Sequence, residues 1–186
     1  VDVPSGTLRV MQWNTHMLRD DCVLAAELVK KWQPDILTMQ EADDYESKGP
    51  YLPKFQALLP DYHFAISGQN VIATRGDYAL THSWPLIHAF EVRQVLEAKI
   101  KIKGKIVNVA TVHMVPQGFM LAVRGNLPIW ENLPHFGPEH LDQARALCKR
   151  VPPTTILTGD FNHTNRGVAA KEFRSRWQDA FEAAGR

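Results

Sequence analysis

Three apolar runs, each ended by carboxylate or carboxamide side chains, constrain the fold of this chain most. The runs span residues 8–12, 36–39 and 155–158, and they lead into Trp13-Asn14, Gln40-Glu41 and Gly159-Asp160-Phe161-Asn162. Short apolar runs are typical of buried strands. Carboxylates and carboxamides at buried strand ends are costly unless they are hydrogen-bonded, paired or coordinating a cation. Three such ends converging would form an oxygen-rich pocket for a hard divalent ion, which points to chemistry on phosphate.

The rest of the chain alternates expected helices with further strands. The first helix has Asp20 or Asp21 as its N-cap and an apolar face made by Leu24, Leu28 and Trp32. Further helices are expected over residues 52–59, 140–150 and 168–177, and further strands over 62–66, 70–74, 95–102 and 105–112. The turn Lys103-Gly104 joins the last two strands as a hairpin. Because residues 105–112 are apolar on both faces, a central strand is expected there. The pattern predicts sheets covered by helices.

Composition indicates one globular domain over residues 1–186. The hydrophobic fraction is 45% and the charged fraction 22%, both ordinary for a folded domain. The formal net charge of +1 gives no sign of a protein that coats polyanions. No apolar stretch approaches the ~18–20 residues of a membrane span. The chain begins with Val1 rather than Met, so a processed protein or an excised piece is expected, and localisation stays undetermined with a lean toward a bacterial protein outside the cytoplasm.

Two features allow more than one interpretation. Cys22 and Cys148 could form a disulfide, but two half-buried thiols on helices are favoured. Residues 114–139 are rich in Pro and Gly and show no sustained period. Loops of that length are often functional. This one could grip a ligand or fold back over the core.

Glu41, Asp160 and Asn162 are the leading candidates for chemistry. Glu41 follows an apolar strand, and one carboxylate is a usual protein anchor for Mg²⁺, although an exposed loop acid fits as well. Asp160 and Asn162 alternate, so on a strand or its extension they would face the same way. A carboxylate beside an amide can position a water and hold a phosphate oxygen. An Asx-rich turn is the alternative.

Three further residues have a functional and a structural interpretation. Asn14 could orient a carboxylate, bind a metal through its carbonyl, or close a turn. His113 could donate to a phosphate oxygen or be a satisfied core histidine. Arg93 could reach phosphate or face solvent. No metal-like spacing links the remaining candidates His16, His82, His88 and His163.

Four segments together resemble the endonuclease/exonuclease/phosphatase superfamily, which has the fold of pancreatic-type deoxyribonuclease. They are LRVMQWN, QPDILTMQE, VNVATVHM and TILTGDFNHT, in this order from Leu8 onward. The resemblance implies an α+β fold, a four-layer α/β/β/α sandwich with two central mixed sheets flanked by helices. It also implies a Mg²⁺- or Mn²⁺-dependent hydrolase that cleaves a phosphodiester by attack of water.

The resemblance assigns roles to the candidate residues. Glu41 would bind the metal with Asn14 in support, and Asp160 would orient or activate the water. Asn162 and His113 would stabilise the transition state, where positioning and charge supply most of the rate. The substrate stays open among nucleic acid, a phospholipid headgroup and a small phosphoester. The alternating Lys99, Lys101, Lys103 and Lys105 could line a nucleic-acid groove, but a solvated hairpin face is favoured.

The chain departs from the family pattern after its last expected helix. The family has a further segment there, with an aspartate and a Ser-Asp-His-like motif whose histidine acts as a base. Its absence here leads us to expect a C-terminally truncated domain that lacks the closing strands. An unpaired sheet edge would then favour self-association. The alternative function is a catalytically impaired family member that serves as a binding module.

Overall fold

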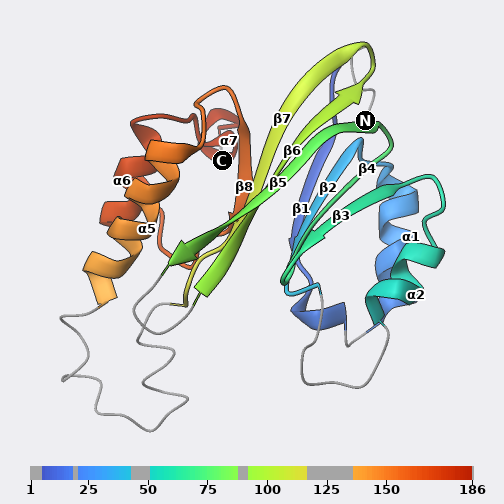
Figure 1. Cartoon of the computed structure of the whole chain (residues 1–186), viewed down its shortest axis with the longest axis horizontal. Coiled ribbons are helices and arrows are strands. Elements are labelled where there is room, and N and C mark those ends of the chain that lie inside the picture. The colour runs from blue at the N-terminus through green and yellow to red at the C-terminus, as the bar shows by residue number, and fades with distance from the viewer. Residues whose placement is uncertain (1–5, 19–20, 43–50, 88–91, 117–135, 186) are drawn as a thin grey trace, which may run out of the picture. The chain divides into compact units, whose positions relative to one another are not determined.

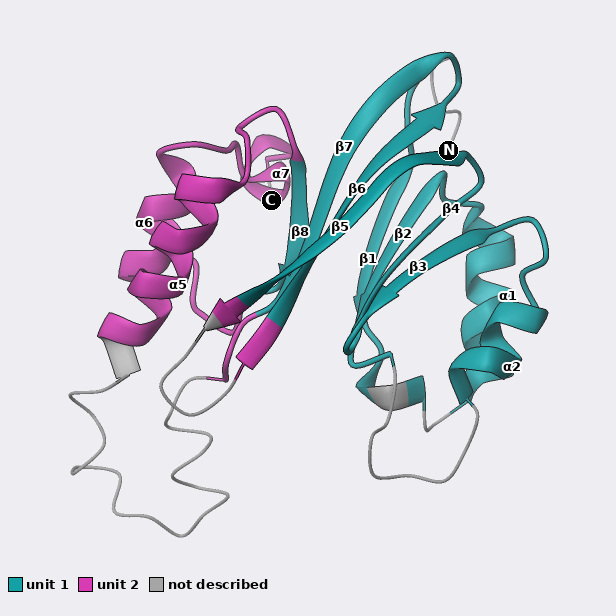
Figure 2. Ribbon diagram, viewed as in Figure 1, with its two compact units in different colours: residues 1–85, 94–113, 156–160 teal, residues 86–93, 114–155, 161–186 magenta. Residues whose placement is uncertain are grey.

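The computed structural model describes residues 6–18, 21–42, 51–87, 92–116 and 136–185. It divides into two compact units (Figure 2). Unit 1 holds residues 1–85, 94–113 and 156–160, and unit 2 holds residues 86–93, 114–155 and 161–186. None of the helices in the described ranges is both long and apolar enough to span a bilayer.

The first sheet has the strand order β1-β2-β4-β3. Its strands are β1 (Val10–Asn14), β2 (Ile36–Gln40), β3 (His63–Ser67) and β4 (Asn70–Thr74). β1 and β2 are parallel, whereas β4 runs antiparallel to both of its neighbours. Because Asn14 pairs with Gln40, the first two polar signatures lie side by side at one edge of this sheet.

The second sheet has the order β5-β6-β7-β8. Its strands are β5 (Asp77–Ile87), β6 (Val92–Ile102), β7 (Lys105–His113) and β8 (Ile156–Asp160). β7 lies between antiparallel β6 and parallel β8, which confirms the predicted central strand. The sequence pattern does not predict β5, because its exposed polar residues and Pro85 do not form a buried-strand pattern. An edge strand tolerates both.

The two sheets of unit 1 enclose one apolar layer, and helices cover the far face of the first sheet. Ile36, Ile72, Ile100 and Val109 belong to the buried cluster between the sheets. The helices α1 (Cys22–Trp32) and α2 (Tyr51–Ala57) lie along the other face of the first sheet (Figure 1). Two mixed four-stranded sheets with flanking helices confirm the predicted fold class.

The predicted apolar face of α1 is wrong. Leu24 and Trp32 are 53% and 56% exposed, whereas Cys22, Ala25, Ala26 and Val29 are buried. The buried residues also have helical spacing, and their small side chains let the helix approach the sheet closely. The predicted N-cap Asp21 is confirmed, because its carboxylate accepts hydrogen bonds from the amides of Val23 and Leu24. Asp20 lies outside the described residues.

Unit 2 contains three helices within the described ranges. They are α5 (Phe136–Arg150), α6 (Val168–Arg174) and α7 (Ala180–Ala183). The predicted loop over 114–139 therefore ends in a helix, while its residues 117–135 lie outside the described part of the chain. Cys148 on α5 and Cys22 on α1 are both free thiols on helices, as favoured, but they are buried rather than half-buried. Burial also raises the pKa of Cys148.

Gly159 on β8 allows a close approach that no other residue could make. Its φ is +148°, and a Cβ there would lie 2.1 Å from the carbonyl oxygen of Val112 on the paired strand. Gly159→Ala should therefore destabilise the protein by at least about 2 kcal/mol in chemical denaturation. Gly167→Ala is the control, because its Cβ would meet nothing closer than 3.3 Å. Equal unfolding free energies for the two variants would contradict the steric clash inferred at Gly159.

Candidate metal centre

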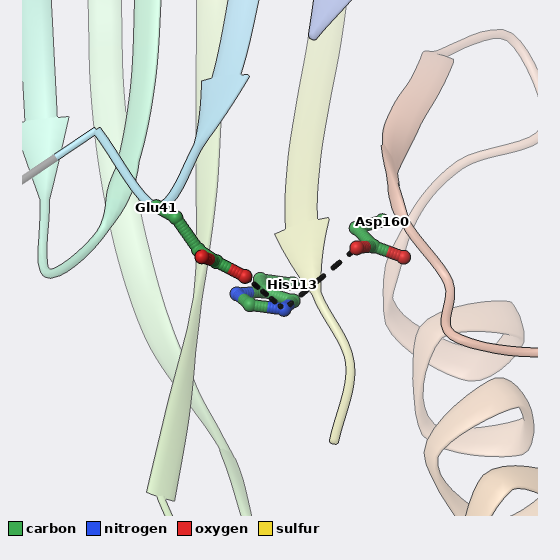
Figure 3. Close-up of side chains that lie close together, drawn as sticks. All are labelled: Glu41, His113 and Asp160. Atoms are coloured by element: carbon green, nitrogen blue, oxygen red, sulfur yellow. Dashed lines mark ion pairs between the residues drawn. The ribbon is translucent and has the colours of Figure 1, made fainter. Parts of the chain in front are cut away.

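Glu41, His113 and Asp160 bring three potential ligand atoms together in unit 1. Each offers one such atom, and these atoms lie within 4.8 Å of one another. The Nε2 atom of His113 is 3.6 Å from Oε1 of Glu41 and 3.9 Å from Oδ2 of Asp160 (Figure 3). Residues far apart in the sequence thus converge as the strand-end signatures predict.

Strand pairing places these side chains. β7 and β8 are parallel, and His113 is directly opposite Asp160 at their carboxyl ends. β1 and β2 are also parallel, so Asn14 lies opposite Gln40 and Glu41 follows one residue later. Since the carboxyl ends of parallel strands meet at the same end of a sheet, the first sheet contributes Glu41 and the second contributes His113 and Asp160.

Asn14 links the two carboxylates. Its Nδ2 donates to Oε1 of Glu41 at 3.0 Å and to Oδ2 of Asp160 at 2.8 Å. Its Oδ1 accepts the backbone amide of His16 at 3.1 Å. The Asn14 amide therefore orients both carboxylates, while its side-chain oxygen also closes an Asx turn with His16. Metal binding through that oxygen, which keeps a second lone pair, stays a prediction.

Glu41 has an unusual backbone that Thr15 supports. The φ of Glu41 is +50°, a left-handed conformation that few residues other than glycine adopt. The buried hydroxyl of Thr15 lies 3.1 Å from the carbonyl oxygen of Gln40 and 3.0 Å from that of Glu41, and its amide donates to the former. Sequence reasoning missed Thr15, because a threonine after a strand carries no distinctive signal.

The exposure of the cluster suits a cation and a phosphate group. The side chains of Glu41 and Asp160 are 22% and 29% exposed, whereas His113 is 6% exposed. The carboxylates can therefore meet solvent, whereas the imidazole between them is mostly buried. Carboxylate oxygens suit Mg²⁺ and Mn²⁺, so the side chains of Glu41 and Asp160 fit either ion.

Asn162 does not continue the strand alternation that the sequence suggested. β8 ends at Asp160, and Asn162 has a left-handed φ of +49°. The inference that Asp160 and Asn162 share a strand face is therefore wrong. The Asn162 amide donates to the carbonyl oxygen of Met114 at 2.8 Å. Its role toward phosphate stays a prediction.

Arg93 and the other histidines do not belong to the ligand cluster within the described ranges. Arg93 is half-buried near the start of β6, and its contact with phosphate also stays a prediction. His16 and His82 are exposed, and His163 is half-buried beside Phe173. His88 lies outside the described residues.

The chain matches the model of one protein family and several solved structures. The model of the Endonuclease/Exonuclease/phosphatase family matches residues 11–183. No curated protein matches the chain. Similar solved structures include that of TDP2 from D. rerio in complex with a single-strand DNA product, at 18% sequence identity and a TM-score of 0.64. The match covers 88% of this chain and 64% of that one.

Two bacterial structures are similar to the same extent. Mannosyl-6-phosphatase from Bacteroides thetaiotaomicron has 18% identity and a TM-score of 0.66, over 91% of this chain and 70% of its own. Sphingomyelinase C from Streptomyces griseocarneus has 12% identity and a TM-score of 0.62, over 92% and 70%. At these identities the matches show the fold alone.

Proposed function

Because the chain belongs to the endonuclease/exonuclease/phosphatase family, we propose that it is a divalent-metal-dependent phosphoesterase that hydrolyses a phosphodiester by attack of water. The observation that carries this proposal is the cluster of Glu41, His113 and Asp160, whose two carboxylates are joined by Asn14. Carboxylates paired with an amide donor and a buried imidazole suit metal binding and charge stabilisation at phosphate.

Glu41 is the proposed anchor for Mg²⁺ or Mn²⁺, with Asn14 holding its carboxylate in place. The ion, when bound, would polarise a phosphoryl oxygen and offset the charge that develops in the transition state. Glu41 is suited to this task because its carboxylate is partly exposed while its backbone is held by Thr15.

Asp160 and His113 are proposed to act directly on the reactants. The Asp160 carboxylate orients the attacking water and accepts its proton, and the Asn14 amide keeps that carboxylate in position. The His113 Nε2 lies between both carboxylates and donates a hydrogen bond to a phosphate oxygen. As contacts to phosphate, Asn162 and Arg93 stay predictions from the sequence.

The three neighbours named above indicate the substrate classes to test. Their names refer to a DNA product, a sphingomyelinase and a sugar phosphatase. We therefore propose a phosphodiester in a nucleic acid or a phospholipid headgroup, with a small phosphoester as the third class. The net charge of +1 weighs against tight binding of long polyanions. Rates on DNA, RNA, sphingomyelin and inositol phosphates would rank these classes.

Removal of metal tests the proposed function. Hydrolysis of bis-p-nitrophenyl phosphate should stop after treatment with a chelator and return with Mg²⁺ or Mn²⁺. Glu41→Ala should weaken binding of the ion by more than about 10-fold in calorimetry, since even supporting groups contribute that much. Glu27→Ala is the control, because Glu27 is an exposed acid on α1.

Two results would contradict the proposal. One is hydrolysis at the same rate with and without metal. The other is an unchanged metal affinity in Glu41→Ala. A folded protein that binds neither ion and hydrolyses none of these substrates would instead support a binding module.

A further inference from the structure

On four strands, a polar residue stands between the strand end at the candidate site and an apolar residue further back. Thr38 and Thr111 are buried, whereas Thr158 is half-buried and Gln12 is exposed. In each of β1, β2, β7 and β8, three residues at alternate positions share one face of the strand. The first is apolar, the second is polar, and the third ends the strand. These sets are Val10, Gln12 and Asn14; Ile36, Thr38 and Gln40; Val109, Thr111 and His113; and Ile156, Thr158 and Asp160. Parallel pairing keeps neighbouring sets in register. The middle of each set therefore lies one layer below the strand ends.

Below the Asn14–Asp160 bond at the strand ends, a second hydrogen bond connects the two sheets. The Nε2 of Gln40, on β2, donates to Oγ1 of Thr111, on β7, at 2.7 Å. The Oε1 of Gln40 accepts from Nε2 of Gln12 at 2.6 Å. Gln40 and Thr111 are both 0% exposed. A buried amide is costly without partners, and these two bonds satisfy both ends of the Gln40 side chain.

The position of this bond relates it to the candidate site. Glu41 directly follows Gln40, and His113 lies two residues after Thr111 on the same face of β7. Apolar contacts between sheets are non-directional, whereas a hydrogen bond requires a narrow range of distance and angle. Together with the Asn14–Asp160 bond, it therefore constrains the position of the first sheet's strand ends against those of the second sheet.

We propose that Gln40 and Thr111 are positioning residues, which hold the Glu41 carboxylate at its working distance from His113 and Asp160. This inference rests on the proposed function, because it assigns the two residues a role in that same metal site. It goes further by separating their contribution to site geometry from their contribution to stability.

The double variant Gln40→Met/Thr111→Val provides the test. It replaces both partners with apolar groups of similar shape. The Gln12 amide loses its acceptor, but Gln12 is exposed and can bond to water, so the change should be close to neutral for stability. We expect a melting temperature within about 5 °C of the wild type. We also expect the affinity for Mg²⁺ or Mn²⁺ in calorimetry to fall by about 10–100-fold, the usual effect of removing groups that orient ligands. A crystal structure should show His113 Nε2 displaced from its 3.6 Å separation from Glu41 Oε1.

Two single variants separate positioning from packing. Thr111→Ser keeps the hydroxyl but loses a buried methyl, so it should lower the melting temperature while keeping metal affinity within about 3-fold of the wild type. Thr38 lies on β2, on the same face as Gln40. Thr38→Val removes its buried hydroxyl, which has no hydrogen-bond partner within the described residues. Because an unpartnered buried hydroxyl is costly, this change should keep or raise the melting temperature, with metal affinity within about 3-fold of the wild type. A purely structural role would make metal affinity follow stability across all three variants.

The outcomes distinguish the positioning role from the proposed function. If the double variant binds the ion as tightly as the wild type, the positioning role is overturned and the proposed function stands. If the wild type itself binds neither ion, the proposed function fails. The crystal structure of the double variant then decides the positioning role, and an unchanged separation between His113 and Glu41 overturns it.

Discussion

Asp160→Asn is expected to lower kcat for phosphodiester hydrolysis by about 10²–10⁴-fold, the usual contribution of a positioned acid–base group. Asparagine has nearly the shape of aspartate but cannot accept a proton from water. It also removes the charged acceptor that receives the Asn14 amide at 2.8 Å. Kinetics at saturating Mg²⁺ or Mn²⁺ would measure the effect.

Kinetics and metal titration of a second variant separate the role of the Glu41 carboxylate from that of the Asp160 carboxylate. Glu41→Ala should chiefly weaken metal affinity, whereas Asp160→Asn should chiefly lower kcat once the metal is saturating. Asp142→Asn is the control, because Asp142 is an exposed acid on α5. A kcat for Asp160→Asn close to that of the control would remove Asp160 from the mechanism.

Asp35→Ala is expected to cause a large loss of stability. The carboxylate is 2% exposed and accepts hydrogen bonds from Arg75 at 2.8 Å, from Lys103 at 2.7 Å and from the Arg9 amide at 2.8 Å. It therefore joins the start of β2 to the β6–β7 turn. These bonds also assign Lys103 a structural role, unlike the exposed Lys99 and Lys101.

The expected cost of Asp35→Ala is about 2–4 kcal/mol in the free energy of unfolding. Breaking a fully buried ion pair costs about 3–5 kcal/mol, because it leaves an uncompensated charge. Here the remaining charges can reach water, since Arg75 and Lys103 are 35% and 43% exposed. Urea denaturation at about pH 7 would measure the loss. Asp77→Ala, at an exposed acid on β5, should change stability by less than about 0.5 kcal/mol.

The effect of Asp35 should depend on pH. Burial favours the neutral acid, but the hydrogen bonds from Lys103, the Arg9 amide and Arg75 outweigh it and hold the pKa of Asp35 below its ordinary value of 3.8. A folded pKa below the unfolded one adds stability that is complete above the unfolded pKa and is lost as the pH falls through the folded pKa. The gap between wild type and Asp35→Ala should therefore narrow as the pH falls from about 5 to about 3. A gap that widens over this range would contradict the assignment.

Much of the fold follows from local patterns. Short apolar runs before polar residues predicted β1, β2 and β8, and the two-sided apolar run predicted the central strand β7. The failures occurred where two patterns competed. In α1, small and large apolar residues both have helical spacing, and packing selected Ala25 and Val29 over Leu24 and Trp32. The polar edge strand β5 lacked a burial pattern altogether.

The candidate site likewise has one part that local patterns predict and another that they do not. The sequence by itself determined which residues stand at strand ends, because strand propensity and alternation act over a few neighbours. Only the tertiary structure decided how these ends meet: Asn14 donates to Asp160 across 146 residues, and Gln40 meets Thr111 across 71. Such contacts depend on strand register and on the packing of one sheet against the other. No local pattern specifies either, because both arise from the burial of the whole apolar layer between the sheets.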